Sequence, residues 1–309
     1  MLRPASQGIL RATRCQELSA AKLLTCVGLG AGVAWSMSRW VRGRRERKCL
    51  LRAGAIRRVP STWYRVDGIR IHARVSEGTP KPGPDPVILI HGLGVSSTYF
   101  TPSAERLASR FTVFAPDLPG HGRSAANSFR PNVEDLAQFA LRWMSAAGIS
   151  RASIVGHSMG CQIAIEMAIR EPGRISRLVL AAPTPDPHAR TVADQFWRLL
   201  VGTLYERTAL TLIVLKDYLR MGTRFIPEFY AMLRYPTENK LPLVTVPTLV
   251  IRGEHDPVVP QRWAEAAASL IGNDPVLVIP GWGHAIQYSA APQFVRAITP
   301  FLSGGADPS

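Results

Sequence analysis

A serine stands at the centre of the most informative run in this 309-residue chain. Ser158 lies in the pentapeptide Gly-His-Ser-Met-Gly (156–160), which follows a strand-like run at 153–155 and precedes a helix-forming run at 161–170. A strand, a small-residue turn and a helix in this order are typical of a nucleophile elbow, which exposes the serine hydroxyl above the sheet. The pattern predicts a nucleophilic serine; the alternative is an ordinary turn whose serine caps the helix.

An acid and a histidine follow this serine along the chain. The apolar run 247–251 precedes Asp256, and a second apolar run, 276–279, precedes His284. Each side chain stands just past a predicted strand, where open α/β sheets place their ligands. We therefore predict that His284 is the general base that activates Ser158, and that Asp256 orients and stabilises this histidine.

With two further motifs, the chain resembles the α/β-hydrolase fold family over about residues 60–303. An apolar run at 87–90 leads into His91-Gly92, and the sequence at 117–124 looks like the family's D-x-x-G-x-G-x-S turn. The resemblance implies an α/β fold with a mostly parallel central sheet, helices on both faces and an inserted helical lid. Alternating apolar and helical runs favour the same architecture, with strands at 87–90, 112–115, 152–155, 178–182, 247–251 and 276–279.

The resemblance also implies where a developing negative charge is held. In the family, the residue after the His-Gly pair and the residue after the nucleophile each give a backbone amide to an oxyanion hole. Here these residues are Leu93 and Met159. In some relatives the acid follows an earlier strand, so Asp186 is the alternative to Asp256 as the acid of the triad. Asp117 belongs to a turn that is structural in most members of the family. We expect neither a metal nor a cofactor.

The net charge of +15 is concentrated near the N-terminus. Residues 1–58 hold thirteen Lys and Arg against two acids, and the other residues hold 24 basic and 20 acidic groups. We therefore predict a basic appendage, 1–58, and a hydrolase domain, 59–309. A basic cluster beside a membrane explains the charge more simply than nucleic-acid binding, so no nucleic-acid partner is expected.

The appendage contains an uncharged run of sixteen residues, 23–38, with basic residues on both sides. A membrane span needs about 17–25 residues, and flanking arginines can reach the interface. We predict a membrane-anchoring helix, with the hydrolase domain on the cytoplasmic side because the following flank is more basic. The alternatives are a cleaved signal peptide, a mitochondrial presequence, or, if the protein is cytoplasmic, a tail that packs on the protein itself or is disordered.

The alternation of strands and helices stops between 182 and 246. Residues 191–235 read as helices rich in large apolar side chains, with Phe196, Leu199, Leu200 and Leu204 at helical spacing. Relatives carry a lid at this position, and we place it at about 184–244. An apolar lid indicates a hydrophobic substrate; the alternative is that the stripe only packs the lid on the core.

These features predict a serine hydrolase that cleaves a lipophilic ester, such as a monoacylglycerol-like lipid, through an acyl-enzyme. A serine at 158 argues against the haloalkane dehalogenases and epoxide hydrolases of the family, which carry aspartate there. The alternatives are a carbon–carbon hydrolase of dienoic diketo acids, a cofactor-free perhydrolase, and a ligand-binding receptor that has kept its triad. The sequence predicts no oligomeric state.

Overall fold

The computed structural model describes residues 45–78, 83–126, 131–272 and 275–304. Its contacts divide the chain into two compact units, Met1–Arg58 and Val59–Ser309. In the first unit, residues 45–52 are helical. The run 23–38, for which we predicted an anchoring helix, lies outside the described residues, and none of the helices within them is long and apolar enough to cross a bilayer.

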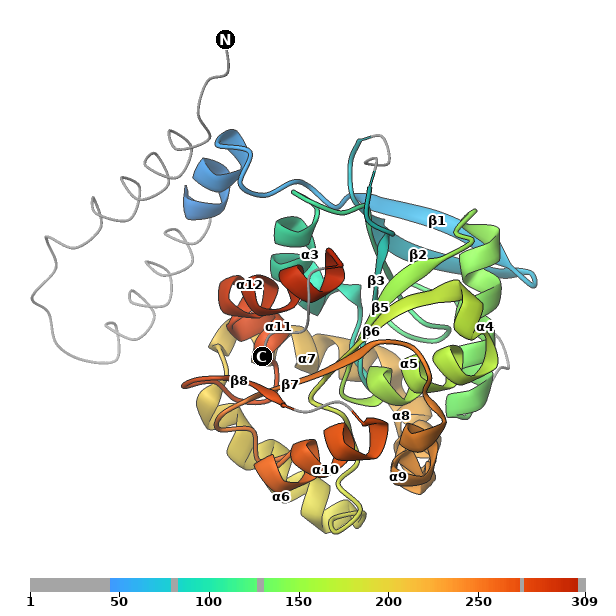
Figure 1. Ribbon diagram of the computed structural model, residues 1–309, viewed down its shortest axis with the longest axis vertical. Helices are drawn as coiled ribbons and strands as arrows, with labels where there is room; N and C mark the ends of the chain where they lie inside the picture. The colour runs from blue at the N-terminus through green and yellow to red at the C-terminus, as the bar shows by residue number, and fades with distance from the viewer. Residues whose placement is uncertain (1–44, 79–82, 127–130, 273–274, 305–309) are drawn as a thin grey trace, which may run out of the picture. The chain divides into compact units, whose positions relative to one another are not determined.

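The described part of the second unit is built on an eight-stranded sheet, in the order β1-β2-β4-β3-β5-β6-β7-β8 (Figure 1). The first two strands and the β2–β4 pair are antiparallel, and the other neighbours are parallel. Each of the six predicted strands is confirmed, with ends shifted by at most three residues. The strands are β1 (Ser61–Val66), β2 (Ile69–Val75), β3 (Val87–Ile90), β4 (Val113–Pro116), β5 (Ala152–His157), β6 (Ile175–Ala181), β7 (Thr248–Gly253) and β8 (Leu277–Ile279).

The hairpin of β1 and β2 turns at an Asp-Gly pair. Asp67 has φ 50° and Gly68 has φ 76°. Two successive residues with positive φ form the turn that matches the twist of a two-residue hairpin, and aspartate and glycine are the residues that tolerate it. The turn fixes the pairing of Val66 with Ile69 and hence the register of the whole hairpin.

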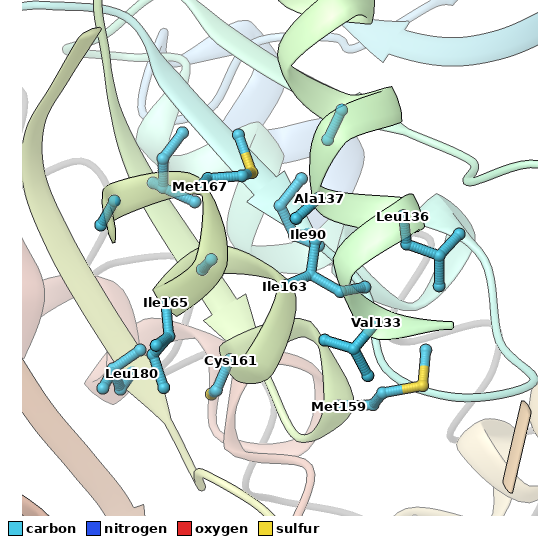
Figure 2. Packing of buried hydrophobic residues seen from close by; sticks show 14 of the residues in the cluster. Ile90, Val133, Leu136, Ala137, Met159, Cys161, Ile163, Ile165, Met167 and Leu180 are labelled. Atoms are coloured by element: carbon cyan, nitrogen blue, oxygen red, sulfur yellow. The ribbon is translucent and has the colours of Figure 1, made fainter. Parts of the chain in front are cut away.

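Helices cover both faces of the sheet and divide its side chains between two cores. In β3, Ile88 and Ile90 belong to one core, with α4, α5 and α10, while Val87 and Leu89 belong to the other, with α3 and α12. Figure 2 shows part of the first core, at α5 and the neighbouring elements. The helices outside the lid are α3 (Thr101–Leu107), α4 (Val133–Ala146), α5 (Met159–Arg170), α10 (Gln261–Ile271), α11 (Ile286–Ser289) and α12 (Ala291–Leu302), with 3-10 turns η1 (Ser97–Phe100) and η2 (Pro172–Arg174).

Between β6 and β7 the chain leaves the sheet and forms the inserted helical lid. Its N-terminal helix begins after Thr191, whose hydroxyl accepts a hydrogen bond from the Asp194 amide. The second lid helix joins the core through Asp217, which accepts a 2.5 Å hydrogen bond from the Ser96 hydroxyl. The lid elements are α6 (Val192–Gly202), η3 (Thr203–Tyr205), α7 (Thr208–Met221), η4 (Gly222–Arg224), α8 (Phe225–Arg234), α9 (Thr237–Lys240) and η5 (Leu241–Leu243).

Candidate active site

Ser158 stands on the turn between β5 and α5, with φ 55° and ψ −124°. Positive φ is strained for a residue that has a side chain, so the surroundings must hold it there. A Cβ on Gly156 would collide with the backbone of Gly160, and a Cβ on Gly160 would collide with the Ile90 carbonyl. The close passage of backbone therefore requires both glycines, and the turn has the geometry expected of a nucleophile elbow.

The structure brings the predicted acid and base together. Nδ1 of His284 lies 2.8 Å from Oδ2 of Asp256, and this nitrogen must carry the proton because it faces a carboxylate. The other carboxylate oxygen accepts hydrogen bonds from the amides of Val258 (2.8 Å) and Val259 (3.1 Å), so the acid is held firmly. His284 and Ser158 line the same cavity. The free Nε2 is thus the nitrogen available to take a proton there.

Opposing effects act on the charge of His284. Burial disfavours its protonated form, but the charge and hydrogen bond of Asp256, together with the charge of Glu206, outweigh burial and raise the pKa of His284 above the usual 6.5. Asp256 therefore stabilises the imidazolium that forms when the histidine accepts a proton.

The other two acids considered from the sequence have different partners. Asp186 is fully buried and accepts hydrogen bonds from Arg198 (2.9 Å) and Arg262 (2.7 Å). Asp117 pairs with Nδ1 of His72 at 2.9 Å, and this bond and others overcome burial and lower its pKa to about 2. Neither carboxylate is bonded to His284, so the geometry favours Asp256 over Asp186.

The loop after β3 carries the first expected oxyanion donor. Nδ1 of His91 donates to the Gly92 carbonyl at 2.8 Å, and its Nε2 accepts from the Leu118 amide at 2.9 Å. Burial is the main cause that lowers the pKa of His91 to about 3, so the ring is neutral and can accept this bond. Leu93 lines the cavity, and within the described residues its amide donates to no protein acceptor. Met159 begins α5, where an amide has no partner within the helix.

A chain of hydrogen bonds that the sequence did not predict joins the loop after β3 to the segment that carries His284. The Gly92 amide donates to Tyr99 Oη at 2.8 Å, and this hydroxyl lies 2.9 Å from Nδ1 of His157. Nε2 of His157 is 3.0 Å from the His284 carbonyl and must donate to it. Nδ1 is therefore the acceptor, and burial lowers the pKa of His157, which keeps the ring neutral. The histidine of the pentapeptide is thus linked by hydrogen bonds to both the loop after β3 and the backbone at His284.

Glu206 is a second residue that sequence reasoning missed. It comes from the lid, between η3 and α7, and its carboxylate accepts a 2.7 Å hydrogen bond from the Ala285 amide and another from the Ser289 hydroxyl. Burial raises the pKa of Glu206, while these two hydrogen bonds favour its charged form. The contacts span about eighty positions of the chain, and no local pattern marks them. The lid is therefore tied directly to the segment that follows His284.

Between the lid and the carboxyl ends of the strands lies a cavity of about 680 Å³. Its wall is mainly apolar, and the polar groups near Ser158 are few. The described residues of the wall include no Lys or Arg, and no cluster of His, Cys, Asp or Glu within the described chain has the arrangement of a metal site. Apolar residues from both the core and the lid form the wall, among them Val95, Leu210, Val214, Phe229, Met232 and Val258.

The chain belongs to the α/β-hydrolase family, whose sequence profile matches residues 87–297. A protein of Caulobacter sp. (strain K31), provisionally named carbamate hydrolase RutD, is 28% identical over 253 residues, which cover 74% of this chain and 94% of that protein. The fold is similar to that of a membrane phospholipase A, described as a bacterial virulence factor (TM-score 0.67, 23% identity, 89% of this chain and 96% of that chain). It is also similar to the enol-lactonase of Burkholderia xenovorans LB400 (TM-score 0.64, 22% identity, 78% and 100%). The family to which the chain belongs is a family of hydrolase enzymes.

Proposed function

We propose that this protein is a serine hydrolase that cleaves a lipophilic carboxylic ester. The observation that carries the proposal is a shared cavity: Ser158, on its strained turn, and His284, bonded to Asp256, line one apolar space. Those three side chains are the parts that acyl transfer through a serine requires.

In the proposed mechanism, Nε2 of His284 removes the hydroxyl proton of Ser158 while Oγ attacks the ester carbonyl carbon. The amides of Leu93 and Met159 stabilise the oxyanion of the tetrahedral intermediate, and each such donor is worth roughly 3–4 kcal/mol. His284 then protonates the leaving alcohol, and an acyl group remains on Ser158. A water molecule, deprotonated by the same histidine, releases the acid and restores the serine.

The cavity supports the lipophilic part of the proposal. An apolar wall gains free energy from each methylene that it removes from water, roughly 0.8 kcal/mol. The described wall contains no Lys or Arg that could pair with the carboxylate of a substrate. The cavity therefore favours a neutral ester over the dienoic diketo acids that carbon–carbon hydrolases cleave. A receptor remains an outcome of the test below, because it can retain the same three residues, as a perhydrolase can.

The test uses p-nitrophenyl esters of graded acyl length with the purified full-length protein. The specificity constant should rise with chain length until the cavity is filled. Ser158→Ala should abolish turnover and labelling by a fluorophosphonate, whereas Ser269→Ala, at an exposed serine of α10, should change neither. Acylation without turnover would favour a receptor, and labelling that persists in Ser158→Ala would refute the assignment of the nucleophile.

We also propose that residues 1–58 form a separate appendage that attaches the enzyme to a membrane through 23–38. The uncharged run and its basic flanks support this, and the excess of positive charge after the run places the hydrolase domain on the cytoplasmic side under the positive-inside rule.

A further inference from the structure

The outer surface of the lid is far more apolar than the rest of the described surface. Within the described chain, sixteen large apolar side chains are exposed, and twelve of them fall between residues 192 and 230. The other four, Trp63, Leu243, Leu270 and Val278, are scattered over β1, η5, α10 and β8. Soluble proteins rarely expose so many large apolar groups together unless something binds there. We call these twelve residues the lid face.

On α7, the exposed apolar side chains of the lid face follow the spacing of a helix. On α7, Leu212, Leu215 and Leu219 are 67%, 55% and 75% exposed, and their spacing of three and four residues places them on one side of the helix. On the opposite side, Asp217 and Met221 are buried. The helix therefore packs on the core with one side and presents a separate leucine stripe outward.

On α7 and α8, the basic side chains of α7 lie outside and the acidic side chains lie inside. On α7, Lys216 and Arg220 are exposed and stand beside the leucine stripe, one helical turn apart. The acids of α7 and α8 turn inward: Asp217 accepts from Ser96, and Glu228 lies 3.2 Å from Nε2 of His121. On α6, by contrast, Asp194 is exposed. An apolar stripe with basic residues along its border is the pattern of helices that lie in the interface of an anionic membrane.

The lid face continues into the cavity. Six exposed apolar side chains of the lid also line the cavity wall: Val192, Phe196, Leu199, Leu200, Ile226 and Tyr230. A second copy of the chain seated on this face would therefore cover these residues of the wall. A bilayer seated on it would instead let an amphiphile pass from the lipid to the cavity along apolar side chains.

We propose that the lid face is a docking surface for a lipid bilayer that contains anionic phospholipids, with the Leu212–Leu219 stripe inserted among the acyl chains and Lys216 and Arg220 at the headgroup phosphates. The twelve residues belong to the second unit, and the proposal does not involve residues 1–58. The proposal concerns binding and goes beyond the proposed ester hydrolysis, so it can be tested without any turnover.

The test follows a tryptophan of the lid in the full-length protein. Trp197 on α6 is 64% exposed, and Trp63 on β1 is 41% exposed. The protein is mixed with vesicles of equal parts phosphatidylglycerol and phosphatidylcholine, with or without bromine on the acyl chains, because bromine quenches only tryptophans that enter the lipid. Trp197→Phe should lose a clear part of the quenching seen in the wild type, and Trp63→Phe, the matched control, should lose none. Tryptophans of the appendage are common to all samples and cancel in the comparison.

Two further variants test the apolar and the charged parts of the surface. Leu215→Asn/Leu219→Asn and Lys216→Glu/Arg220→Glu should each lose most of the quenching that belongs to Trp197, whereas Leu270→Asn, an exposed leucine on α10, should behave as wild type. The charge variant should matter on anionic vesicles and not on pure phosphatidylcholine. Equal quenching in the wild type and Trp197→Phe would overturn the proposal. It would also be overturned if Trp197 stayed unquenched while sedimentation showed a dimer that Leu215→Asn/Leu219→Asn dissociates, because the lid face would then join two copies.

Discussion

At the scale of single residues, the pairing of His284 with Asp256 leads to a first prediction. Asp256→Asn should lower kcat by about 10⁴-fold, because the amide no longer fixes the tautomer or stabilises the imidazolium. Asp186→Asn should change kcat much less, since that carboxylate is bonded to two arginines and not to the base. Steady-state kinetics on a short ester, corrected for the folded fraction, makes the comparison. A larger loss of kcat in Asp186→Asn would transfer the role of the acid to that residue.

The charge on His284 leads to a second prediction, in the pH dependence. Because the pKa of His284 is raised above 6.5, the specificity constant should fall as the pH drops through a midpoint above that value. Below the midpoint the histidine is protonated and cannot remove the serine proton. Asp256→Asn removes the largest effect that raises the pKa, so the residual activity should titrate at lower pH. A midpoint that does not move would mean that another group controls the profile.

The bridge through Tyr99 leads to a third prediction. Tyr99→Phe removes the acceptor of the Gly92 amide and the donor to His157. A buried donor left without a partner costs about 1–3 kcal/mol, and the melting temperature should fall accordingly. We expect kcat to decrease more than KM increases, because the oxyanion loop loses its position relative to His284. Tyr230→Phe, at an exposed tyrosine of the cavity wall, is the control, and equal effects from both variants would argue against a positioning role.

At the scale of elements, the sequence predicted what local patterns can encode. Short apolar runs predicted the strands, and small residues around Ser158 predicted the turn, because both depend on neighbours in the chain. The bonds of Tyr99 to His157 and of Glu206 to Ala285 join residues 58 and 79 positions apart. No local sequence spacing predicts such contacts, because they depend on how the lid and the loops pack on the sheet in the tertiary structure. The spacing of Phe196, Leu199, Leu200 and Leu204 predicted a helix in the lid. Only the structure shows which side of that helix is exposed.

The link between lid and base leads to a fourth prediction. Glu206→Gln keeps an oxygen that can accept from the Ala285 amide but removes the negative charge. Since that charge helps to raise the pKa of His284, the midpoint of the activity profile should move to lower pH while the thermal stability changes little. Glu265→Gln, on the surface of α10, is the control. An unchanged midpoint together with a large loss of stability would make Glu206 a purely structural tie.

At the scale of the whole molecule, the basic character and the proposed catalytic residues occupy different stretches of sequence. Residues 1–58 carry an excess of eleven positive charges, whereas 59–309 carry an excess of four and contain every residue of the proposed triad and oxyanion hole. The residues that form the two hydrophobic cores described above all belong to the second unit. Its folding and chemistry should therefore be separable from attachment.

This separation leads to the last prediction. A chain that begins at Val59 should fold and should hydrolyse short, water-soluble esters with a specificity constant close to that of the full-length protein. The full-length protein should sediment with membranes and resist extraction by high salt, because salt screens the basic cluster but leaves the inserted apolar run in place. The shortened chain should lose this resistance, because the lid face alone would hold it by a shallow, partly electrostatic contact. Extraction of the full-length protein by salt alone would mean that 23–38 does not insert. Loss of folding on truncation would mean that residues 1–58 belong to the hydrolase core, and the proposal of a separate anchor would then be wrong.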